Sequence, residues 1–220
     1  MDLTPFAQWL NHTFATYDYT ILSALHHLAT VTGGAATPFF VFVSLLAEKG
    51  IGMLLLGIIL FLFKKTRKIG FCILGAVVCG GIITNVLLKD FIARPRPFVD
   101  INGIYHTWWQ FVGAHKDTEF SFPSGHTTAT MAAMTAIFLN TNKKKSWTCF
   151  LFVVLMGISR NYLMMHYPSD ILGGIIAGGI GACIAFFIVK AIYFYLKNHP
   201  NFFISKIFFN FDLLMLPQKK

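Results

Sequence analysis

The sequence predicts an all-α fold, a polytopic membrane helical bundle. Apolar residues make up 55% of the 220-residue chain, and charged residues make up only 12%. A soluble domain carries about 25% charged residues, so this chain has too few to cover a water-exposed surface. It also contains several apolar runs that approach the roughly 20 residues a helix needs to cross a bilayer. These observations exclude a soluble domain, a disordered chain and a fibrous repeat.

Five apolar segments predict membrane crossings. Two of them span a bilayer on their own and three need their flanking residues: 69–88 and 171–189 in the first group, and 50–63, 124–139 and 146–159 in the second. For the segment that starts at Gly50, we expect the helix to extend back past Glu48 and Lys49. The predicted bundle therefore has five transmembrane helices, or six if the N-terminal region contributes one.

The N-terminal region is harder to place. Residues 19–47 are apolar and lack Asp, Glu, Lys and Arg, but Gly33, Gly34 and Pro38 interrupt them. We interpret this stretch as two interfacial or re-entrant helices, with a sixth crossing as the alternative. The chain then divides into an amphipathic, interfacial or re-entrant region (1–49), a transmembrane core (50–196) and a cytoplasmic or interfacial tail (197–220).

The basic residues predict the orientation of the bundle. Twelve of the eighteen Lys and Arg residues fall between or after the crossings on one side: Lys64, Lys65, Arg67, Lys68, Lys143, Lys144, Lys145, Lys190, Lys197, Lys206, Lys219 and Lys220. The positive-inside rule makes that side cytoplasmic, so the basic excess indicates topology and not a nucleic-acid partner. Six cations remain on the outer side, against the rule: Lys49, Lys89, Arg94, Arg96, Lys116 and Arg160. Cations placed against the positive-inside rule suggest that they have a role other than setting the topology.

Three short segments on the outer side carry the candidate chemistry. The first runs from Lys89 to Pro97, the second is Phe122-Pro-Ser-Gly-His126, and the third runs from Ser159 to Asp170. They bring three cations to one membrane depth, where an unpaired cation is costly and where guanidinium and ammonium groups suit phosphate oxygens. The second segment opens a helix at Ser124, and a helix N-terminus also favours a phosphate.

Two histidines complete this set. His166 and Asp170 are four residues apart, so a helical turn brings them to one face. A carboxylate on one imidazole nitrogen leaves the other nitrogen free to attack, and His126 suits protonation of a leaving oxygen. Each segment alone has a structural explanation: membrane anchors, an N-cap with a turn, or an ion pair between Arg160 and Asp170. Their occurrence together on one side favours phosphoryl chemistry.

The same residues carry a family resemblance. Lys89-x6-Arg96-Pro97, Pro123-Ser124-Gly125-His126 and Ser159-Arg160-x5-His166-x3-Asp170 resemble the three signature motifs of the type 2 phosphatidic acid phosphatase superfamily. That superfamily includes bacterial undecaprenyl-diphosphate and phosphatidylglycerophosphate phosphatases as well as soluble vanadium haloperoxidases. The resemblance covers residues 89–170 with no motif position missing. It implies an active site at the outer membrane–water interface.

The resemblance also implies a role for each residue. His166 is the expected nucleophile, Asp170 orients it, and His126 protonates the leaving group and then activates water. The expected phosphate ligands are Lys89, Arg96, Ser124, Gly125 and Arg160. Arg94 lies outside the motif positions, and we interpret it as an anchor or a secondary headgroup contact. No metal and no cofactor are implied, because cations and amides supply the electrostatic stabilisation.

The sequence leaves the substrate open. The leading hypothesis is a membrane phosphatase for a lipid phosphate or diphosphate, with undecaprenyl diphosphate ahead of phosphatidylglycerophosphate and phosphatidic acid. The competing hypotheses are a haloperoxidase and a transporter or scaffold that binds phosphate headgroups without chemistry. The aromatic loop 91–122 is interpreted as an interfacial belt, with a lid as the alternative. Glycines after Ile171 allow close helix packing within one chain or between two copies, so the oligomeric state stays open.

Overall fold

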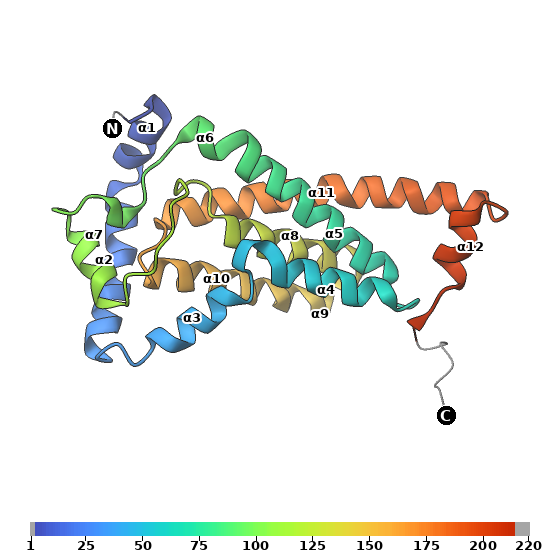
Figure 1. Cartoon of the computed structure of the whole chain (residues 1–220), viewed down its shortest axis with the longest axis horizontal. Coiled ribbons are helices and arrows are strands. Elements are labelled where there is room, and N and C mark those ends of the chain that lie inside the picture. Colours follow the sequence, from blue (N-terminus) through green and yellow to red (C-terminus); the bar gives the residue numbers. More distant parts are fainter. Residues whose placement is uncertain (1–2, 214–220) are drawn as a thin grey trace.

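The computed structural model describes residues 3–213, and all regular structure in that range is helical (Figure 1). The helices are α1 Pro5–Thr13, α2 Ala15–Val31, α3 Thr37–Leu45, α4 Ile51–Leu62, α5 Arg67–Gly81, α6 Lys89–Ile92, α7 Ile104–Phe111, α8 Gly125–Asn140, α9 Lys143–Ser146, α10 Phe150–Tyr162, α11 Pro168–Asn198 and α12 Phe203–Asn210. A π-helical segment, Ile82–Leu88, joins α5 to α6. The predicted all-α fold is confirmed.

Three helical runs within the described residues are long and apolar enough to cross a membrane: Thr37–Leu62, Arg67–Val99 and Pro168–Asn198. Helices α8 and α10, which correspond to two further predicted crossings, contain 16 and 13 residues. The chain is therefore a membrane protein, and five or six crossings stay a prediction.

The first of these runs contains a sharp kink. Lys49 and Gly50 have φ angles of 49° and 75°, in the left-handed region that glycine adopts at little cost. The expectation that the helix extends back past Glu48 and Lys49 is therefore wrong: α4 begins at Ile51, and a 3-10 turn, Glu48–Gly50, separates it from α3. The kink places the Glu48 side chain at the same end of the bundle as His126.

The centre of the bundle is formed by α5, α8 and α11, with α4 packed against α5. Their contact surface consists largely of alanine and other small side chains, including Ala76, Ala132, Ala133 and Ala182, all fully buried. Glycines bring the helices closer still. A Cβ on Gly174 would lie 2.7 Å from the Ser124 carbonyl oxygen, and a Cβ on Gly178 would lie 2.5 Å from that of Thr128. These glycines of α11 are used for packing within the chain.

The N-terminal helices cover one end of this bundle. Helix α2 runs across the end and contacts both α10 and α11 (Figure 1). A second apolar core lies here, and Leu22 of α2, Phe40 of α3 and Trp108 of α7 are buried in it. The Trp108 ring also stacks on His26, with centroids 4.6 Å apart. The aromatic loop 91–122 therefore packs in part against the N-terminal helices.

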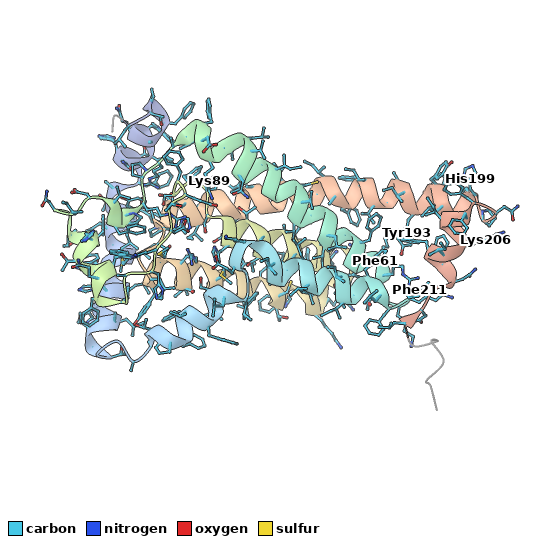
Figure 2. All side chains as sticks on the ribbon, in the orientation of Figure 1. Phe61, Lys89, Tyr193, His199, Lys206 and Phe211 are labelled. Carbon is cyan, nitrogen blue, oxygen red and sulfur yellow. The ribbon has the colours of Figure 1, made fainter. Side chains whose placement is uncertain are left out.

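The C-terminal helix α12 lies at the opposite end of the bundle (Figure 1). Arg67 is 3% exposed there and donates to the carbonyl oxygens of Phe208 and Phe211. Figure 2 shows Phe61, Tyr193 and Phe211 at this end and Lys89 near the other. Arg67 is one of the twelve cations that indicated the topology. It is buried, and its hydrogen bonds hold the C-terminal segment against this end of the bundle. The last seven residues of the predicted tail lie outside the described residues.

Candidate active site

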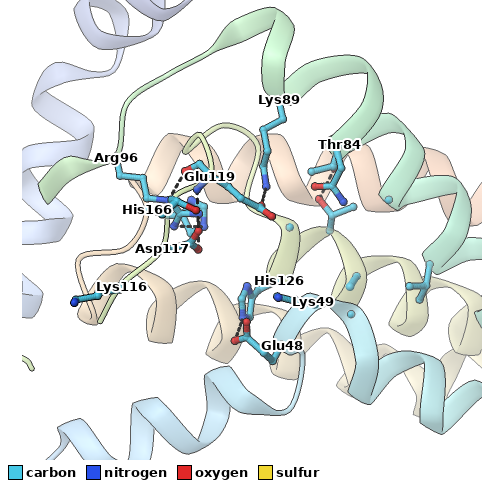
Figure 3. A pocket seen from close by; sticks show the side chains of 18 residues that line it. Glu48, Lys49, Thr84, Lys89, Arg96, Lys116, Asp117, Glu119, His126 and His166 are labelled. Carbon is cyan, nitrogen blue, oxygen red and sulfur yellow. Dashed lines mark hydrogen bonds and ion pairs between the residues drawn. The ribbon is translucent and has the colours of Figure 1, made fainter. Parts of the chain in front are cut away.

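A cavity of about 490 Å³ opens at the end of the bundle that carries the sequence motifs (Figure 3). Five of the eight predicted site residues line it: Lys89, Arg96, Gly125, His126 and His166. Two others lie directly behind its wall, because Ser124 and Asp170 are fully buried and adjoin Gly125 and His166. Arg160 lines a smaller cavity of about 160 Å³ that shares Glu48, Lys116 and Asp117 with the first. The fold therefore gathers all eight predicted residues at one place.

His166 and Asp170 meet at the start of α11. Pro168 occupies the first helical turn, where its missing N–H costs no hydrogen bond. Asp170 Oδ2 accepts from the Tyr167 amide at 2.8 Å, lies 2.5 Å from Ser121 Oγ and 3.5 Å from His166 Nδ1. The carboxylate thus faces one imidazole nitrogen, Nδ1, and leaves Nε2 without a carboxylate partner.

The other imidazole nitrogen of His166 faces the cations. Its Nε2 lies 3.3 Å from a terminal nitrogen of Arg96. Burial, together with the nearby charges of Arg96 and Arg160, holds the pKa of His166 well below its usual range. The imidazole is therefore neutral at pH 7, and neutral imidazole is the form that can attack.

The turn at Ala93 positions Arg96. Ala93 ends α6 in the left-handed conformation, with φ 51°, and the two prolines that follow hold the next residues extended. Arg96 then donates to the carbonyl oxygens of Glu119 and Met165 at 2.7 and 2.9 Å. Five donors on one rigid fork let this side chain join three segments and still contact His166.

The start of α8 forms another wall of the site. Ser124 is at the N-cap position, as predicted, but its side chain makes no capping bond. Its backbone N–H instead donates to the Asp170 carbonyl oxygen at 3.1 Å, which joins α8 to α11. His126, in the first turn, has its Nε2 3.1 Å from Glu48 Oε2.

Two carboxylates of one loop pair with the predicted phosphate ligands. Glu119 contacts Lys89, and Asp117 lies 2.6 Å from Arg96 and 4.0 Å from Arg160. The hydrogen bond from Lys89 lowers the pKa of Glu119 below its usual value. These carboxylates occupy the positions around the cations that an anionic ligand would take.

All six cations that the positive-inside rule left unexplained lie at this end. Lys49, Lys89, Arg96 and Lys116 line the larger cavity and Arg160 the smaller one. The interpretation of Arg94 as an anchor or headgroup contact is wrong. Arg94 is 1% exposed, and one of its terminal nitrogens lies 2.6 Å from Asp170 Oδ1. Arg94 therefore turns inward to Asp170, whereas Arg96 faces His166.

Sequence reasoning missed several residues of the site: Asp18, Glu48, Arg94, Asp117, Glu119 and Ser121. Asp18 was a visible signal, since it is an acidic residue just before a long stretch without charge. The others lie outside any motif spacing. Within residues 3–213, no three His, Cys, Asp or Glu side chains are grouped so that they could hold a metal ion.

A family model described as the PAP2 superfamily matches residues 70–196. The chain belongs to this superfamily. The match includes all three motifs, the whole of α6, α8 and α10, and most of α5 and α11. Together with its phosphatase relatives, this match shows that the PAP2 protein is a lipid phosphatase. The first 69 residues, which contribute Asp18 and Glu48 to the site, lie outside the matched range.

The PAP2 protein is similar to phosphatases of other organisms. It is 32% identical to undecaprenyl-diphosphatase BcrC of Bacillus subtilis over 72% of this chain and 77% of that protein. It is 33% identical to phosphatidylglycerophosphatase B of the same species, over 49% of this chain and about half of that protein's length. The crystal structure of Aquifex aeolicus LpxE shares its fold, with a TM-score of 0.56 and 24% identity over 72% of this chain and 92% of that one.

Proposed function

We propose that this PAP2 phosphatase hydrolyses undecaprenyl diphosphate to undecaprenyl phosphate through a phosphohistidine on His166. The observation that carries the chemistry is the placement of His166, with Nδ1 toward Asp170 and Nε2 toward Arg96 in a cavity lined by cations. The substrate rests on the relatives, because the undecaprenyl-diphosphatase aligns over more of both chains than the phosphatidylglycerophosphatase does.

The first chemical step follows from this geometry. The terminal phosphoryl group enters between Lys89, Arg96 and Arg160 and displaces Asp117 and Glu119. His166 Nε2 attacks phosphorus, the bond to the bridging oxygen breaks, and His126 gives that oxygen a proton. The cations and the amide at Gly125 stabilise the charge that develops on the phosphoryl oxygens.

The second step regenerates the enzyme. His126, now neutral, accepts a proton from water as the water attacks phosphorus, and the bond from phosphorus to His166 breaks. Inorganic phosphate leaves, and the His166 imidazole is neutral again. Asp170 holds the ring in one tautomer through both steps. No metal and no cofactor take part in this proposal.

We further propose that the protein is a multi-pass protein of the cell membrane and that its site faces the outside. The support is the charge distribution: twelve Lys and Arg fall on the side that the positive-inside rule makes cytoplasmic, and five of the six others line the two cavities. Substrate is then taken from the outer leaflet, with its lipid tail between helices.

The test is phosphate release by purified protein from undecaprenyl diphosphate, phosphatidylglycerophosphate and phosphatidic acid at matched concentrations in one detergent. We expect the highest kcat/KM on undecaprenyl diphosphate and no release by His166→Ala on any of the three. A higher kcat/KM on either phospholipid would move the assignment to that substrate. Release by His166→Ala would refute the phosphohistidine mechanism.

A further inference from the structure

A buried polar network centred on Arg94 lies behind the cavity and not in it. Arg94 is 1% exposed and does not line the cavity. Its terminal nitrogens bond to Asp170 Oδ1 at 2.6 Å, Ser169 Oγ at 2.7 Å and Asp18 Oδ2 at 2.9 Å, and its Nε bonds to Asn11 at 2.8 Å. The guanidinium also lies 3.9 Å from the centre of the Tyr167 ring. Each of its three nitrogens therefore has a hydrogen-bond partner.

In this network the two carboxylate oxygens of Asp170 have different partners. Oδ2 accepts from the Tyr167 amide and faces Ser121 and His166, whereas Oδ1 pairs with Arg94. A carboxylate with no exposed surface needs a counter-charge to stay ionised, and among the described residues Arg94 is the cation in contact with it. A neutral Asp170 would hold the imidazole ring far less firmly.

Asp18 is the second carboxylate that pairs with the Arg94 guanidinium. It is 2% exposed and accepts from the Ser169 amide and hydroxyl at 2.8 and 2.7 Å. It therefore also binds the N-terminus of α11, where a negative charge is favoured. Asp18 and Asn11 come from α2 and α1, outside the residues that the family model matches.

We propose that Arg94 is a positioning residue for the nucleophile: it holds the Asp170 carboxylate ionised and oriented toward His166, and Asp18 and Asn11 of the N-terminal helices hold Arg94. The proposal rests on the proposed function, since it assumes that His166 attacks. It makes the N-terminal helices part of the catalytic apparatus of this chain, although no residue of α1 or α2 lines the cavity.

The experiment compares five purified variants by rapid-quench measurement of phosphoenzyme and by steady-state kcat and KM. Arg94→Met is expected to lower kcat and the rate of phosphoenzyme formation roughly 10- to 100-fold, the size typical when the partner that orients an acting group is lost. KM should change little. Arg94→Lys should recover part of the loss, because a lysine can still pair with Asp170.

The double variant Asp18→Asn/Arg94→Met separates positioning from charge balance. If Arg94 served only to neutralise buried Asp18, removing both charges would restore activity. We expect the double variant to stay as slow as Arg94→Met, because Asp170 still lacks its partner. Arg67→Met is the matched control, a buried arginine at the far end of the bundle; it should lower thermal stability without lowering kcat.

Wild-type kcat in folded Arg94→Met, or in the double variant, would overturn the proposal. If Arg94→Met does not fold, Arg94→Lys and the charge-balanced double variant decide the question. His166→Ala, the fifth variant, keeps the two proposals apart. Activity in His166→Ala refutes the proposed mechanism, whereas an inactive His166→Ala beside a fully active Arg94→Met refutes only the role of Arg94.

Discussion

Two histidines from different segments face one cavity, yet their surroundings differ. His166 lies between a carboxylate and a guanidinium, and His126 pairs with Glu48, whose side chain is half exposed. The same side chain can thus serve as a nucleophile in one place and as a proton donor in the other. This division leads to two predictions about individual residues.

The first concerns the leaving group. A lipid alkoxide or phosphate leaves slowly without a proton, and general acid catalysis is worth about 10²–10⁴-fold. His126→Ala should lose roughly that much on a lipid substrate and much less in phosphoenzyme formation from an activated aryl phosphate. Rapid quench with labelled substrates measures both. Asp170→Asn should impair both substrates, and equal losses for His126→Ala on the two leaving groups would contradict the assigned role.

The second concerns pH. Burial and the nearby charge of Arg96 lower the pKa of His166 well below the usual histidine value of 6.5. The imidazole therefore stays neutral when the pH of the solution falls below 6.5. Phosphoenzyme formation from an aryl phosphate, corrected for ionisation of the substrate, should therefore stay constant from pH 7 to about pH 6. Measurement in His126→Ala removes the second histidine. A decline in the rate of phosphoenzyme formation with its midpoint at or above pH 6.5 would show that the pKa of His166 is not lowered.

At the scale of elements, one loop controls the charge of the site. Asp117 and Glu119 bring two carboxylates to cations that come from the end of α5–α6, from the following turn and from α10. Any phosphate that enters must replace them. The loop is therefore expected to weaken anion binding in the resting enzyme.

Glu119→Gln tests this expectation. Loss of the carboxylate frees Lys89, so inorganic phosphate should inhibit roughly two- to fivefold more strongly, the size expected for a pair with one exposed partner. The readout is the inhibition constant for phosphate. Asp100→Asn, which removes an exposed charge from the same loop outside the cavity, is the control and should leave that constant unchanged. Weaker inhibition in Glu119→Gln would contradict the expectation.

A second prediction at this scale concerns the contact of α8 and α11. The Cβ of Gly178→Ala would meet the Thr128 carbonyl oxygen at 2.5 Å, whereas that of Gly179→Ala meets only the end of Met131 at 3.8 Å. Overpacking costs about 1–3 kcal/mol, and about 1 kcal/mol shifts Tm by roughly 2–4 °C in a chain of this size. Thermal unfolding in detergent should show a Tm several degrees lower for Gly178→Ala. Gly179→Ala should unfold at or above the wild-type temperature, and equal Tm values would contradict the packing.

At the scale of the whole molecule, the cations separate along the bundle. Those around the cavity lie at one end, and the turn between α4 and α5 and helix α12 lie at the other (Figure 1). An arrangement with one end in the cytoplasm accounts for both groups. Orientation is then a property that chemical labelling can measure directly.

In a variant without native cysteines, a cysteine at the exposed position Lys116 should react with an impermeant thiol reagent in intact cells. A cysteine at the exposed position Lys144 should react only after the cells are opened. Labelling is followed by a shift in gel mobility, and both variants must retain phosphatase activity. The reverse pattern would place the site in the cytoplasm.

The sequence alone predicted the helical membrane fold and the eight candidate site residues, because the signals for both are local patterns. An apolar run of membrane length needs no partner to be recognised. The spacing from His166 to Asp170 lies within one helical turn, and the Pro-Ser-Gly-His segment marks the start of α8. Such signals lie in residues that are close together in the sequence. The structure brings the segments that carry them to one cavity.

The tertiary structure decided the partners. Arg94 meets Asp170 76 residues further along and Asp18 76 residues earlier, and His126 meets Glu48 across 78 residues. Whether a guanidinium faces a carboxylate or the membrane depends on how helices cross, and therefore on glycines such as Gly174 that set the distance from α11 to α8. The sequence by itself thus determined which residues are candidates for the chemistry, and packing between distant segments determined which charges hold those residues in place.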